Sequence, residues 1–506
     1  MPNTNGCIMQ YFEWDLPPGR LWMQLEQQAP ELARNGITAV WIPPAYKGSS
    51  GVNDVGYATY DLWDLGEFDQ RGSVATKYGT KAELLAAIEA LHKQNIQVYA
   101  DIVLDHKMGA DEPEIVLAKE ADPENRGNVG TDTKEIVAWT HYFFPGRQKK
   151  YSDFEWHWYH FSGVDWDAWN GESSVYLFDG KEWADEVDRE KGNFDYLMGA
   201  DIDLSNPEVI AELTRWGQWF LKQTGVDGFR FDAVKHMRFS FYRNWIEKMR
   251  TKAKRELFSV GEYWSPDIEA LKNYLNVTEE KFSLFDVPLH YNLLQAATSM
   301  GSYDMRRLFD GTLVAYKPEL AVTFVDNHDT QPGQALESFI PEWFKPQAYA
   351  VILLREAGYP CVFYGDYYGI TARSLPPHKA LIDRLLRVRK ALSYGRQNDY
   401  MDDPDIIGWT REGDSEHPDS GLAVLLSNAA GGSKTMYVGT QHAGRLLYSL
   451  LEPQAAPLRV AEDGSCEFRV GDGALAVWTF VPPEEGAAAE QARQTPEDCQ
   501  SAGSVV

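Results

Sequence analysis

The segment GFRFDAVKH, residues 228–236, places two charged side chains inside an apolar run. If this segment is a strand, Arg230 and Asp232 share one face, because successive side chains of a strand point to opposite sides. A buried charge is unfavourable, and even a buried ion pair seldom stabilises a fold more than an apolar pair does. The pair is therefore a candidate for chemistry, with Asp232 as a nucleophile that Arg230 keeps ionised and oriented.

Two further carboxyl groups, Glu262 and Asp329, also lie in apolar runs of strand character. Glycoside hydrolysis needs one carboxyl group that attacks or stabilises the anomeric carbon and another that protonates the leaving oxygen. A close cluster raises the pKa of one member, so that one carboxyl group can act as an acid while another stays ionised. A purely structural ion-pair network is the alternative, and it explains three acids together with His106 and His328 less well than chemistry does.

Positioning these residues requires strands that end at a common surface. Eight short runs rich in β-branched and aromatic residues recur along the chain, at 7–14, 37–44, 96–106, 226–234, 257–264, 282–289, 321–329 and 361–369. Segments with helical periodicity lie between them, such as 81–94, 207–223 and 345–358, and the glycines of RNG (34–36) and REAG (355–358) are expected helix C-caps.

Strands that alternate with helices predict an α/β fold, a parallel sheet closed into a (β/α)8 TIM barrel. In that fold the functional residues lie at the C-terminal ends of the strands. The polar residues of four runs fall there: Asp101, Asp105, His106, Arg230, Asp232, Glu262, His328 and Asp329. A doubly wound open sheet is the competing architecture, but it does not explain polar clusters on four separate strands.

The interval after the third strand is too long for a loop, because a structureless connection of roughly 100 residues is implausible in a compact domain. It predicts an inserted domain after strand 3, and alternating runs with glycine-containing turns beyond residue 398 predict a C-terminal antiparallel β-sandwich. The expected organisation is a catalytic barrel at 1–104 and 207–398, inserted domain B at 105–206, a β-sandwich at 399–482 and a loose tail at 483–506.

Composition narrows the function classes. The net charge of −27 argues against nucleic acid as a partner, because phosphates attract Lys and Arg. No apolar stretch approaches the length of a membrane span, and four scattered cysteines have no metal-ligand spacing and imply no disulfide framework. No signal peptide is visible, so we expect a cytoplasmic protein with no membrane partner, and a monomer is the default expectation.

Four motifs in order carry a family resemblance: DIVLDH (101–106), GFRFDAVKH (228–236), GEYW (261–264) and FVDNHD (324–329). Over about residues 5–482 the chain resembles an α-amylase of glycoside hydrolase family 13, in particular the bacterial liquefying type and its cytoplasmic members. The resemblance implies retaining endo-hydrolysis of α-1,4-glucosidic bonds in starch, glycogen or maltodextrins.

Roles follow from the resemblance residue by residue. Asp232 would be the nucleophile, Glu262 the general acid/base, and Asp329 the third carboxylate, which grips sugar hydroxyls. The expected substrate-binding residues are Tyr57, His106, Arg230, Lys235, His236, Trp264 and His328, of which Lys235, His236 and Trp264 would lie on the leaving-group side.

A calcium site is also implied. Asp105, Asp195 and Asp201 offer the oxygen ligands that Ca²⁺ prefers, and the resemblance adds the backbone carbonyl of His236. The family usually has Asn where Asp105 stands, and the extra charge could tighten binding. Liquefying relatives often carry a mixed calcium–sodium cluster, but Ser162, Ala184 and Ser205 stand at matching positions, so we expect one structural Ca²⁺ site without the cluster, although Asp185 could serve as a substitute ligand.

Several alternatives remain. The HxxH of HWYH (157–160) could indicate zinc, but its aromatic surroundings and the lack of a third ligand argue against that interpretation. A metal-dependent amidohydrolase would need an HxH on its first strand, which MQYFEW lacks. A non-catalytic carbohydrate-binding relative would be expected to lose one of the three acids, whereas a transglycosylase or an α-1,6-acting relative would use the same ones.

Overall fold

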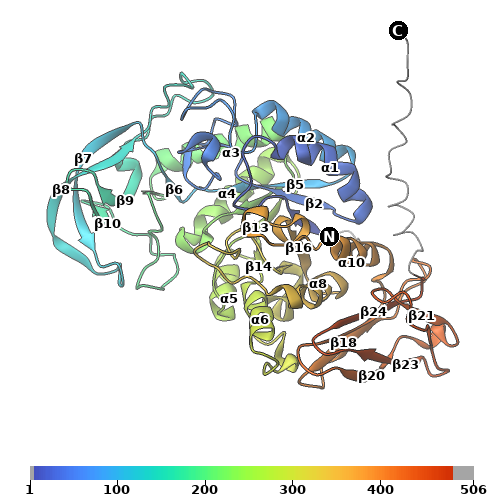
Figure 1. The fold of residues 1–506 in the computed structure, drawn as a ribbon. Coiled ribbons are helices and arrows are strands. Elements are labelled where there is room, and N and C mark those ends of the chain that lie inside the picture. Colours follow the sequence, from blue (N-terminus) through green and yellow to red (C-terminus); the bar gives the residue numbers. More distant parts are fainter. Residues whose placement is uncertain (1–4, 483–506) are drawn as a thin grey trace, which may run out of the picture. The chain divides into compact units, whose positions relative to one another are not determined.

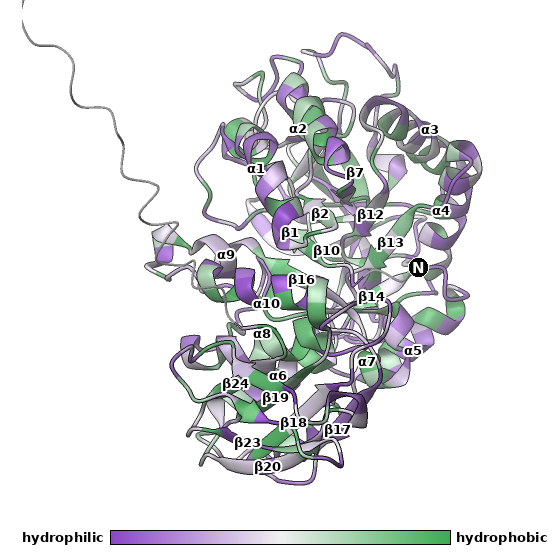
Figure 2. Ribbon diagram, turned by 90° about the vertical axis from the view of Figure 1, so that its right-hand side faces the viewer, coloured by the Kyte–Doolittle hydropathy of each residue, from purple (hydrophilic) through white to green (hydrophobic). Residues whose placement is uncertain are grey.

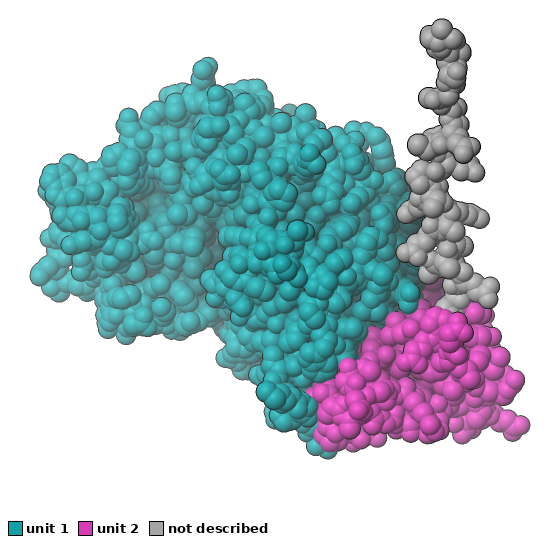
Figure 3. All heavy atoms as spheres, in the orientation of Figure 1, with its two compact units in different colours: residues 1–390 teal, residues 391–506 magenta. Residues whose placement is uncertain are grey.

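A computed structural model describes residues 5–482 of the chain. The described part divides into two compact units, the first of which ends at Lys390 (Figure 3). The domain boundaries expected from the sequence stay predictions. Within the described residues, no helix combines the length and the apolar character that crossing a lipid bilayer requires.

The first unit contains a closed barrel of eight parallel strands (Figure 1). Each of the eight predicted runs contributes one strand, so the predicted α/β barrel is confirmed. The strands, in chain order, are β1(Ile8–Gln10), β2(Ala39–Ile42), β5(Gln97–Ile102), β12(Gly228–Phe231), β13(Phe258–Gly261), β14(Ser283–Phe285), β15(Ala321–Phe324) and β16(Tyr359–Phe363).

Helices follow or separate the barrel strands. They are α1(Leu21–Asn35), α2(Lys81–Lys93), α3(Pro207–Thr224), α4(Phe239–Ala253), α5(Ile268–Val277), α6(Val287–Thr298), α7(Leu313–Tyr316), α8(Lys345–Leu354), α9(Tyr364–Tyr368) and α10(Lys379–Leu392). Hydrophobic and hydrophilic residues alternate along α1, α2 and α3, as expected of helices with one buried face (Figure 2).

Local sequence signals account for several helix ends. Thr80 and Glu83 form a reciprocal capping box at the start of α2. Gly36 ends α1 in the left-handed conformation at φ 103°, as predicted. The prediction for α8 was wrong in its end point, because the helix stops at Leu354 and the extended residue Arg355 follows it. Gly358 instead serves the turn that enters β16, where its φ is 87° and an added Cβ would lie 2.8 Å from Thr323 Cγ2.

Between β5 and β12 the chain builds a second sheet, with the strand order β6-β11-β9-β10-β7-β8. Its longer strands lie side by side in the cyan part of Figure 1. The strands are β6(His106–Lys107), β7(Glu112–Ala121), β8(Val129–His141), β9(Phe161–Asp167), β10(Glu172–Phe178) and β11(Ala200–Ile202). A short hairpin, β3(Lys47–Gly48) with β4(Thr59–Asp61), follows the second barrel strand.

The second unit is antiparallel β-structure around its own hydrophobic core, which includes Leu425, Met436 and Phe468. A six-stranded sheet and a two-stranded sheet, β20-β23, form it. The strands are β17(Gln397–Tyr400), β18(Ile406–Arg411), β19(Leu422–Ser427), β20(Gly432–Tyr437), β21(Leu446–Ser449), β22(Leu458–Arg459), β23(Ser465–Val470) and β24(Leu475–Thr479). The expected tail at 483–506 lies outside the described residues.

Candidate active site and cation site

Strand register places two carboxyl groups at the same level of the barrel. Phe231 pairs with Ile102 on one side and with Gly261 on the other. Asp232 and Glu262 each follow one of these strand ends directly, and their backbone N–H groups continue the ladder by donating to the carbonyls of Ile102 and Phe231 at 3.0 and 2.9 Å. The two carboxyl groups therefore leave neighbouring strands at the C-terminal end, where a barrel carries its functional residues.

Arg230 joins these carboxyl groups through one fully buried guanidinium group. Its Nη1 lies 2.5 Å from Asp232 Oδ1, and its Nη2 lies 3.3 Å from Glu262 Oε2. Nη1 also donates to both carboxylate oxygens of Asp101, at 2.9 and 3.2 Å. The predicted pairing of Arg230 with Asp232 is present, and the same cation also contacts Glu262.

Asp101 is a member of the site that the sequence analysis placed at a strand end without assigning it a function. Its Oδ2 accepts hydrogen bonds from Trp41 Nε1 at 3.0 Å and from the Tyr57 hydroxyl at 2.7 Å. The signal that could have found it is register, because Asp101 lies directly opposite Arg230 on the adjacent strand. Asp101 orients both the guanidinium group and the tyrosine.

The protonation of Glu262 is shifted by its surroundings. Burial raises its pKa to about 8, and the negative charges of Asp232 and Asp329 add to the shift while Arg230 opposes it. Its Oε2 accepts a hydrogen bond of 3.0 Å from the backbone of Ala233. Ala233 has a φ of 51°, a left-handed conformation that is unfavourable for a residue with a side chain. This strained turn lies directly after Asp232 and aims an N–H group at Glu262.

Asp329 reaches the same group of residues from the loop after β15. Its Oδ2 lies 3.3 Å from Nε2 of His328. Burial raises the pKa of Asp329 to about 7, with Asp232 and Asp101 adding to the effect against Arg230. His328 stacks on Tyr57, and Tyr57 donates a hydrogen bond to Asp101, so these contacts connect the third acid to the same group of residues.

Hydrogen bonds hold His328 and His106 in place. Gln10 Nε2 donates to Nδ1 of His328 at 2.9 Å, so the ring proton of a neutral His328 sits on Nε2. Burial lowers the pKa of His328 far below its usual value, and Arg230 adds to this effect. His106 contacts Asp105 through Nδ1 and the Tyr57 carbonyl through Nε2, both at 2.9 Å. Burial opposes protonation of His106, but the hydrogen bond and the charge of Asp105, together with the charge of Asp232 and the bond to Tyr57, outweigh it and raise the pKa.

An aromatic stack borders the carboxyl groups. The Tyr57 ring lies 5.0 Å from the His328 ring at 14°, and the Trp14 ring lies 5.9 Å from Tyr57 at 4°. Flat rings of this kind suit the apolar face of a sugar. Trp14 was missed in the sequence, where it is one of seventeen tryptophans and carries no distinguishing signal.

Lys235 and His236 follow Asp232 along the chain, and Trp264 follows Glu262. Lys235 Nζ forms an ion pair with Glu190 and donates to the Trp264 carbonyl at 3.2 Å. Nδ1 of His236 is 2.9 Å from the Phe194 carbonyl, and burial lowers the pKa of this histidine to about 3. The structure thus connects Lys235 and Trp264 to each other, whereas the His236 ring faces segment 188–195.

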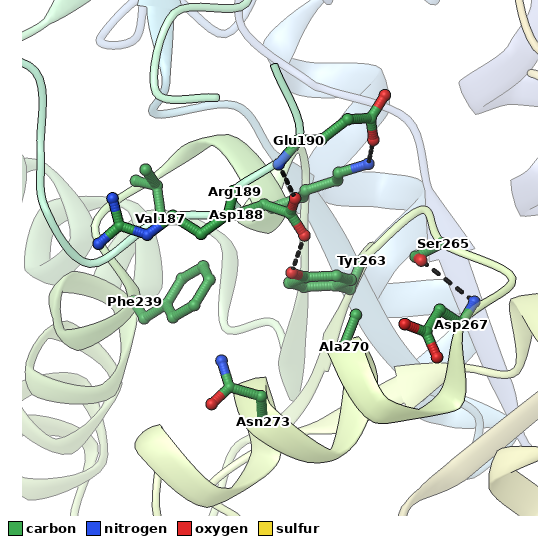
Figure 4. Close-up of a pocket in the computed structure, with 11 residues that line it drawn as sticks. Val187, Asp188, Arg189, Glu190, Phe239, Tyr263, Ser265, Asp267, Ala270 and Asn273 are labelled. Atoms are coloured by element: carbon green, nitrogen blue, oxygen red, sulfur yellow. Dashed lines mark hydrogen bonds and ion pairs between the residues drawn. The ribbon is translucent and has the colours of Figure 1, made fainter. Parts of the chain in front are cut away.

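A pocket of about 290 Å³ lies next to Lys235, between segment 187–190 and the start of α5 (Figure 4). Tyr263 donates a hydrogen bond to Asp188 across it. Its lining also includes Phe239 and Asn273. The pocket is polar and lies on the side of the residues expected at the leaving group.

Three buried carboxyl groups form a separate cluster, Asp105, Asp195 and Asp201. Asp201 lies on β11 opposite His106 of β6, and the Asp105 carbonyl accepts a hydrogen bond from Ile202. Oδ2 of Asp201 is buried without a hydrogen-bond partner among the described residues. Burial raises the pKa of all three, to about 7 for Asp195, and mutual repulsion adds to the shift of Asp195 and Asp201. Close buried carboxylates with an unpaired oxygen fit a hard divalent cation such as Ca²⁺.

Comparisons with known proteins agree with this geometry. A family model described as "Alpha amylase, catalytic domain" matches residues 27–412. The chain is 54% identical over 477 residues to "Alpha-amylase" of Geobacillus stearothermophilus, covering 94% of this chain and 87% of the relative. It is 53% identical over 480 residues to "Alpha-amylase" of Bacillus licheniformis, covering 94% of each.

A further relative is "Cytoplasmic alpha-amylase" of Escherichia coli, 42% identical over 491 residues, which covers 94% of this chain and 99% of the relative. Among solved structures, that of alpha-amylase from Geobacillus thermoleovorans complexed with acarbose superposes with a TM-score of 0.62 at 18% identity. It covers 94% of this chain and 98% of that chain. At this identity the superposition supports the fold.

Proposed function

Since the chain belongs to the alpha-amylase family, we propose that it is an endo-acting α-amylase that hydrolyses α-1,4-glucosidic bonds with retention of anomeric configuration. Starch, glycogen and maltodextrins are the substrate class. The observation that carries the proposal is the single buried guanidinium group of Arg230, which contacts both Asp232 and Glu262. Retaining glycosidases need their two carboxyl groups close together, whereas inverting enzymes need space between them for a water molecule.

In this proposal Asp232 attacks the anomeric carbon while Glu262 protonates the oxygen of the leaving sugar. The ion pair with Arg230 holds the Asp232 carboxylate in position for attack. The raised pKa of Glu262 keeps its proton available near neutral pH. After the leaving sugar departs, ionised Glu262 takes a proton from water, and the resulting hydroxide attacks the glycosyl-enzyme and restores Asp232.

The remaining contacts position the sugar. Nε2–H of His328 and the carboxyl group of Asp329 would bind hydroxyls of the ring that is cleaved, with His106 beside them. Tyr57, held by Asp101, would stack under that ring. Lys235, His236 and Trp264 would bind the leaving-group side, next to the pocket that Tyr263 and Asp188 line.

The family resemblance implies a calcium cofactor, and the donor set fits one. Asp105, Asp195 and Asp201 would hold one structural Ca²⁺, together with the backbone carbonyl of His236. When bound, the ion would neutralise three buried carboxylates that otherwise repel one another, and so would join β6 and β11 to the segment around Asp195. It would support the site without taking part in the reaction.

A single ion, rather than a larger cluster, is supported by Lys181. Its Nζ lies 2.6 Å from Asp203 Oδ2 and donates to the Tyr159 carbonyl at 2.7 Å. Asp203 also accepts two hydrogen bonds from Ser205. The ammonium group supplies the positive charge that a further ion would bring to Asp203.

Cytoplasmic location and a monomeric state complete the proposal. The E. coli relative carries the word cytoplasmic in its name. Cys7, Cys361 and Cys466 are free and buried, which suits a reducing compartment. Cell fractionation and light scattering of the purified protein test these two points.

The decisive experiment incubates the protein with an end-blocked maltoheptaoside and follows fragment size and anomeric configuration. Internal cleavage with α-configured products is the expected result. Inverted products, or full activity in Glu262→Gln, would contradict the role assignments. Predominant transfer of sugar to a second oligosaccharide would identify a transglycosylase with the same carboxyl groups.

Chelation tests the calcium proposal separately. Removing Ca²⁺ is expected to lower both the melting temperature and the activity, and adding back one equivalent of Ca²⁺ should restore both. Asp195→Asn should weaken Ca²⁺ binding without changing the configuration of the products. A chelated protein with unaltered stability and activity would rule out the bracing ion.

A further inference from the structure

A second group of metal-ligand side chains lies in the inserted region, away from the carboxyl cluster. It consists of His141, Glu155 and His157, and one potential ligand atom from each lies within 4.8 Å of the others. The cluster has no role in the proposed hydrolysis.

Backbone pairing brings the three side chains together. Tyr142 and Trp156 form an antiparallel bridge, with both N–H groups donating across it at 2.9 Å. In such a pair, residue 141 lies opposite 157 and residue 143 opposite 155, and these flanking side chains share one face. The His141 and His157 rings stack at 4.4 Å and 17°. Tyr142 and Trp156 are buried, which fixes this arrangement in the sheet.

Each histidine has a carboxylate next to its Nδ1 atom. His141 Nδ1 is 3.2 Å from Glu112 Oε2, and His157 Nδ1 is 3.1 Å from Glu114 Oε1. Metal-binding histidines almost always donate their other ring N–H to a carboxylate, a backbone carbonyl or water, which sets the tautomer and orients the ring. Nε2 is therefore the nitrogen of each ring that is left for an ion.

Two candidate ligand atoms, His141 Nε2 and Glu155 Oε2, are within reach of such an ion. Nε2 of His141 is buried and has no hydrogen-bond partner in the described part of the chain. The nearest acid oxygen is Glu155 Oε2, at 3.9 Å, beyond hydrogen-bond distance. The other oxygen of Glu155 pairs with Lys149 at 2.9 Å, so Oε2 remains available.

The HxxH motif does not supply the ligand pair. His160 Nδ1 accepts a hydrogen bond from the backbone of His157, and its Nε2 is 3.2 Å from Glu208. The ligands that accompany His157 are instead His141, from the strand across the bridge, and Glu155, two residues upstream. The sequence argument against zinc, the lack of a third ligand, therefore does not apply to His157.

We propose that His141 Nε2, His157 Nε2 and Glu155 Oε2 bind one divalent transition-metal ion of the zinc class. Such ions take nitrogen and oxygen ligands at about 2.0–2.2 Å, and water would complete a tetrahedral site. Binding would require the three side chains to rotate toward the ion. The ion would tie the segment around Glu155 to the end of β8. Mixed imidazole and carboxylate donors distinguish this site from the all-oxygen cluster.

Calorimetric titration of the full-length protein with ZnCl2, in the presence of saturating Ca²⁺, tests the proposal. We expect one equivalent of Zn²⁺ to bind, with affinity at least about tenfold lower in His141→Gln and in His157→Gln. His92→Gln is the matched control, because His92 also pairs with a carboxylate, Asp227 at 2.8 Å, but has no second histidine beside it. Equal binding by wild type and both cluster variants, or no binding by wild type, would overturn the proposal.

A second readout does not depend on the stability of the histidine variants. Zn²⁺ should raise the melting temperature of the wild type and of His92→Gln, but much less that of Glu155→Gln, whose side chain is 36% exposed and tolerant of change. Anomalous scattering at the zinc edge should place one ion between the three side chains. A zinc peak at another position, with none at this one, would refute the assignment.

Discussion

Glu262 and Asp232 contact the same guanidinium group, yet only Glu262 is hydrogen-bonded by the strained turn at Ala233. Burial is the largest influence on Glu262 and raises its pKa to about 8. An acid catalyst must be protonated when the substrate binds. As the proposed acid catalyst, Glu262 would hold its proton below pH 8 and lose it as the pH rises through that value.

The first prediction concerns the alkaline side of the pH profile. We expect kcat/KM to fall above about pH 8, approaching tenfold per pH unit. Asp329→Asn should move this limb of the residual activity to lower pH, because Asp329 is one of the charges that raise the pKa of Glu262.

The pH profile must distinguish unfolding of the protein from deprotonation of Glu262. A carboxyl group whose folded pKa exceeds its unfolded value of 4.5 makes the folded state less stable as the pH rises from 4.5 toward 8. Circular dichroism at each pH provides the control. An alkaline limb that coincides with unfolding, or that does not move in Asp329→Asn, would contradict the prediction.

The second prediction concerns Gln10, a positioning residue. Gln10→Leu removes the donor to His328 Nδ1, so the ring is no longer held with its proton on Nε2. We expect kcat/KM to fall about tenfold, the equivalent of one lost hydrogen bond of about 1.4 kcal/mol, measured by steady-state kinetics on maltodextrin. Gln28→Leu serves as a comparison, because Gln28 bonds Tyr11 and Tyr368 rather than the site. Equal kinetic effects of both changes would show that the loss is not specific to His328.

At the scale of elements, a buried ion triad joins the segments that follow β15 and β16. Lys345, the first residue of α8, contacts Asp326 after β15 and Asp366 in α9, the latter at 2.5 Å. All three side chains are almost completely buried. Removing one member of such a group leaves uncompensated buried charge, which is more destabilising than the intact triad is stabilising.

The third prediction is that Lys345→Met destabilises the first unit by about 3–5 kcal/mol, because Asp326 and Asp366 then lie buried together without a cation. Urea denaturation at fixed Ca²⁺ measures the change. Lys379→Met is the control, since its pairs with Glu31 and Asp383 are partly exposed and should contribute less than about 1 kcal/mol. Similar losses in both variants would argue against the importance of burial.

At the scale of the whole molecule, the net charge of −27 opposes compactness through mutual repulsion. Ion pairs act in the other direction, but many of them are exposed and contribute little. Salt weakens both effects, because the Debye length falls to about 10 Å at 0.1 M. Repulsion among an excess of acids should be the larger of the two.

The fourth prediction is therefore that raising NaCl from about 20 to about 200 mM, at constant Ca²⁺, increases the melting temperature by a few degrees. Differential scanning fluorimetry gives the measurement, and a size-matched neutral osmolyte controls for changes in water activity. A decrease would mean that surface ion pairs dominate over repulsion.

The sequence by itself determined the barrel, because its eight strands are short apolar runs that alternate with helical segments, and four of these runs carry polar residues at one end. It also predicted Asp232, Glu262 and Asp329 as a set, since acids within such runs need an explanation. Helix ends were less well determined. The end of α8 depends on how the chain must turn into β16, which is a constraint from outside the helix.

Only the tertiary structure decided which side chains meet. Asp101 joins Arg230 through strand register, Gln10 reaches His328 from the first strand to the seventh, and His141 meets His157 across a backbone bridge. Local periodicity indicates which face of a helix or strand is buried, but it does not indicate which distant element packs against that face. Pairing and register supply this information, and they arise only when the whole chain packs.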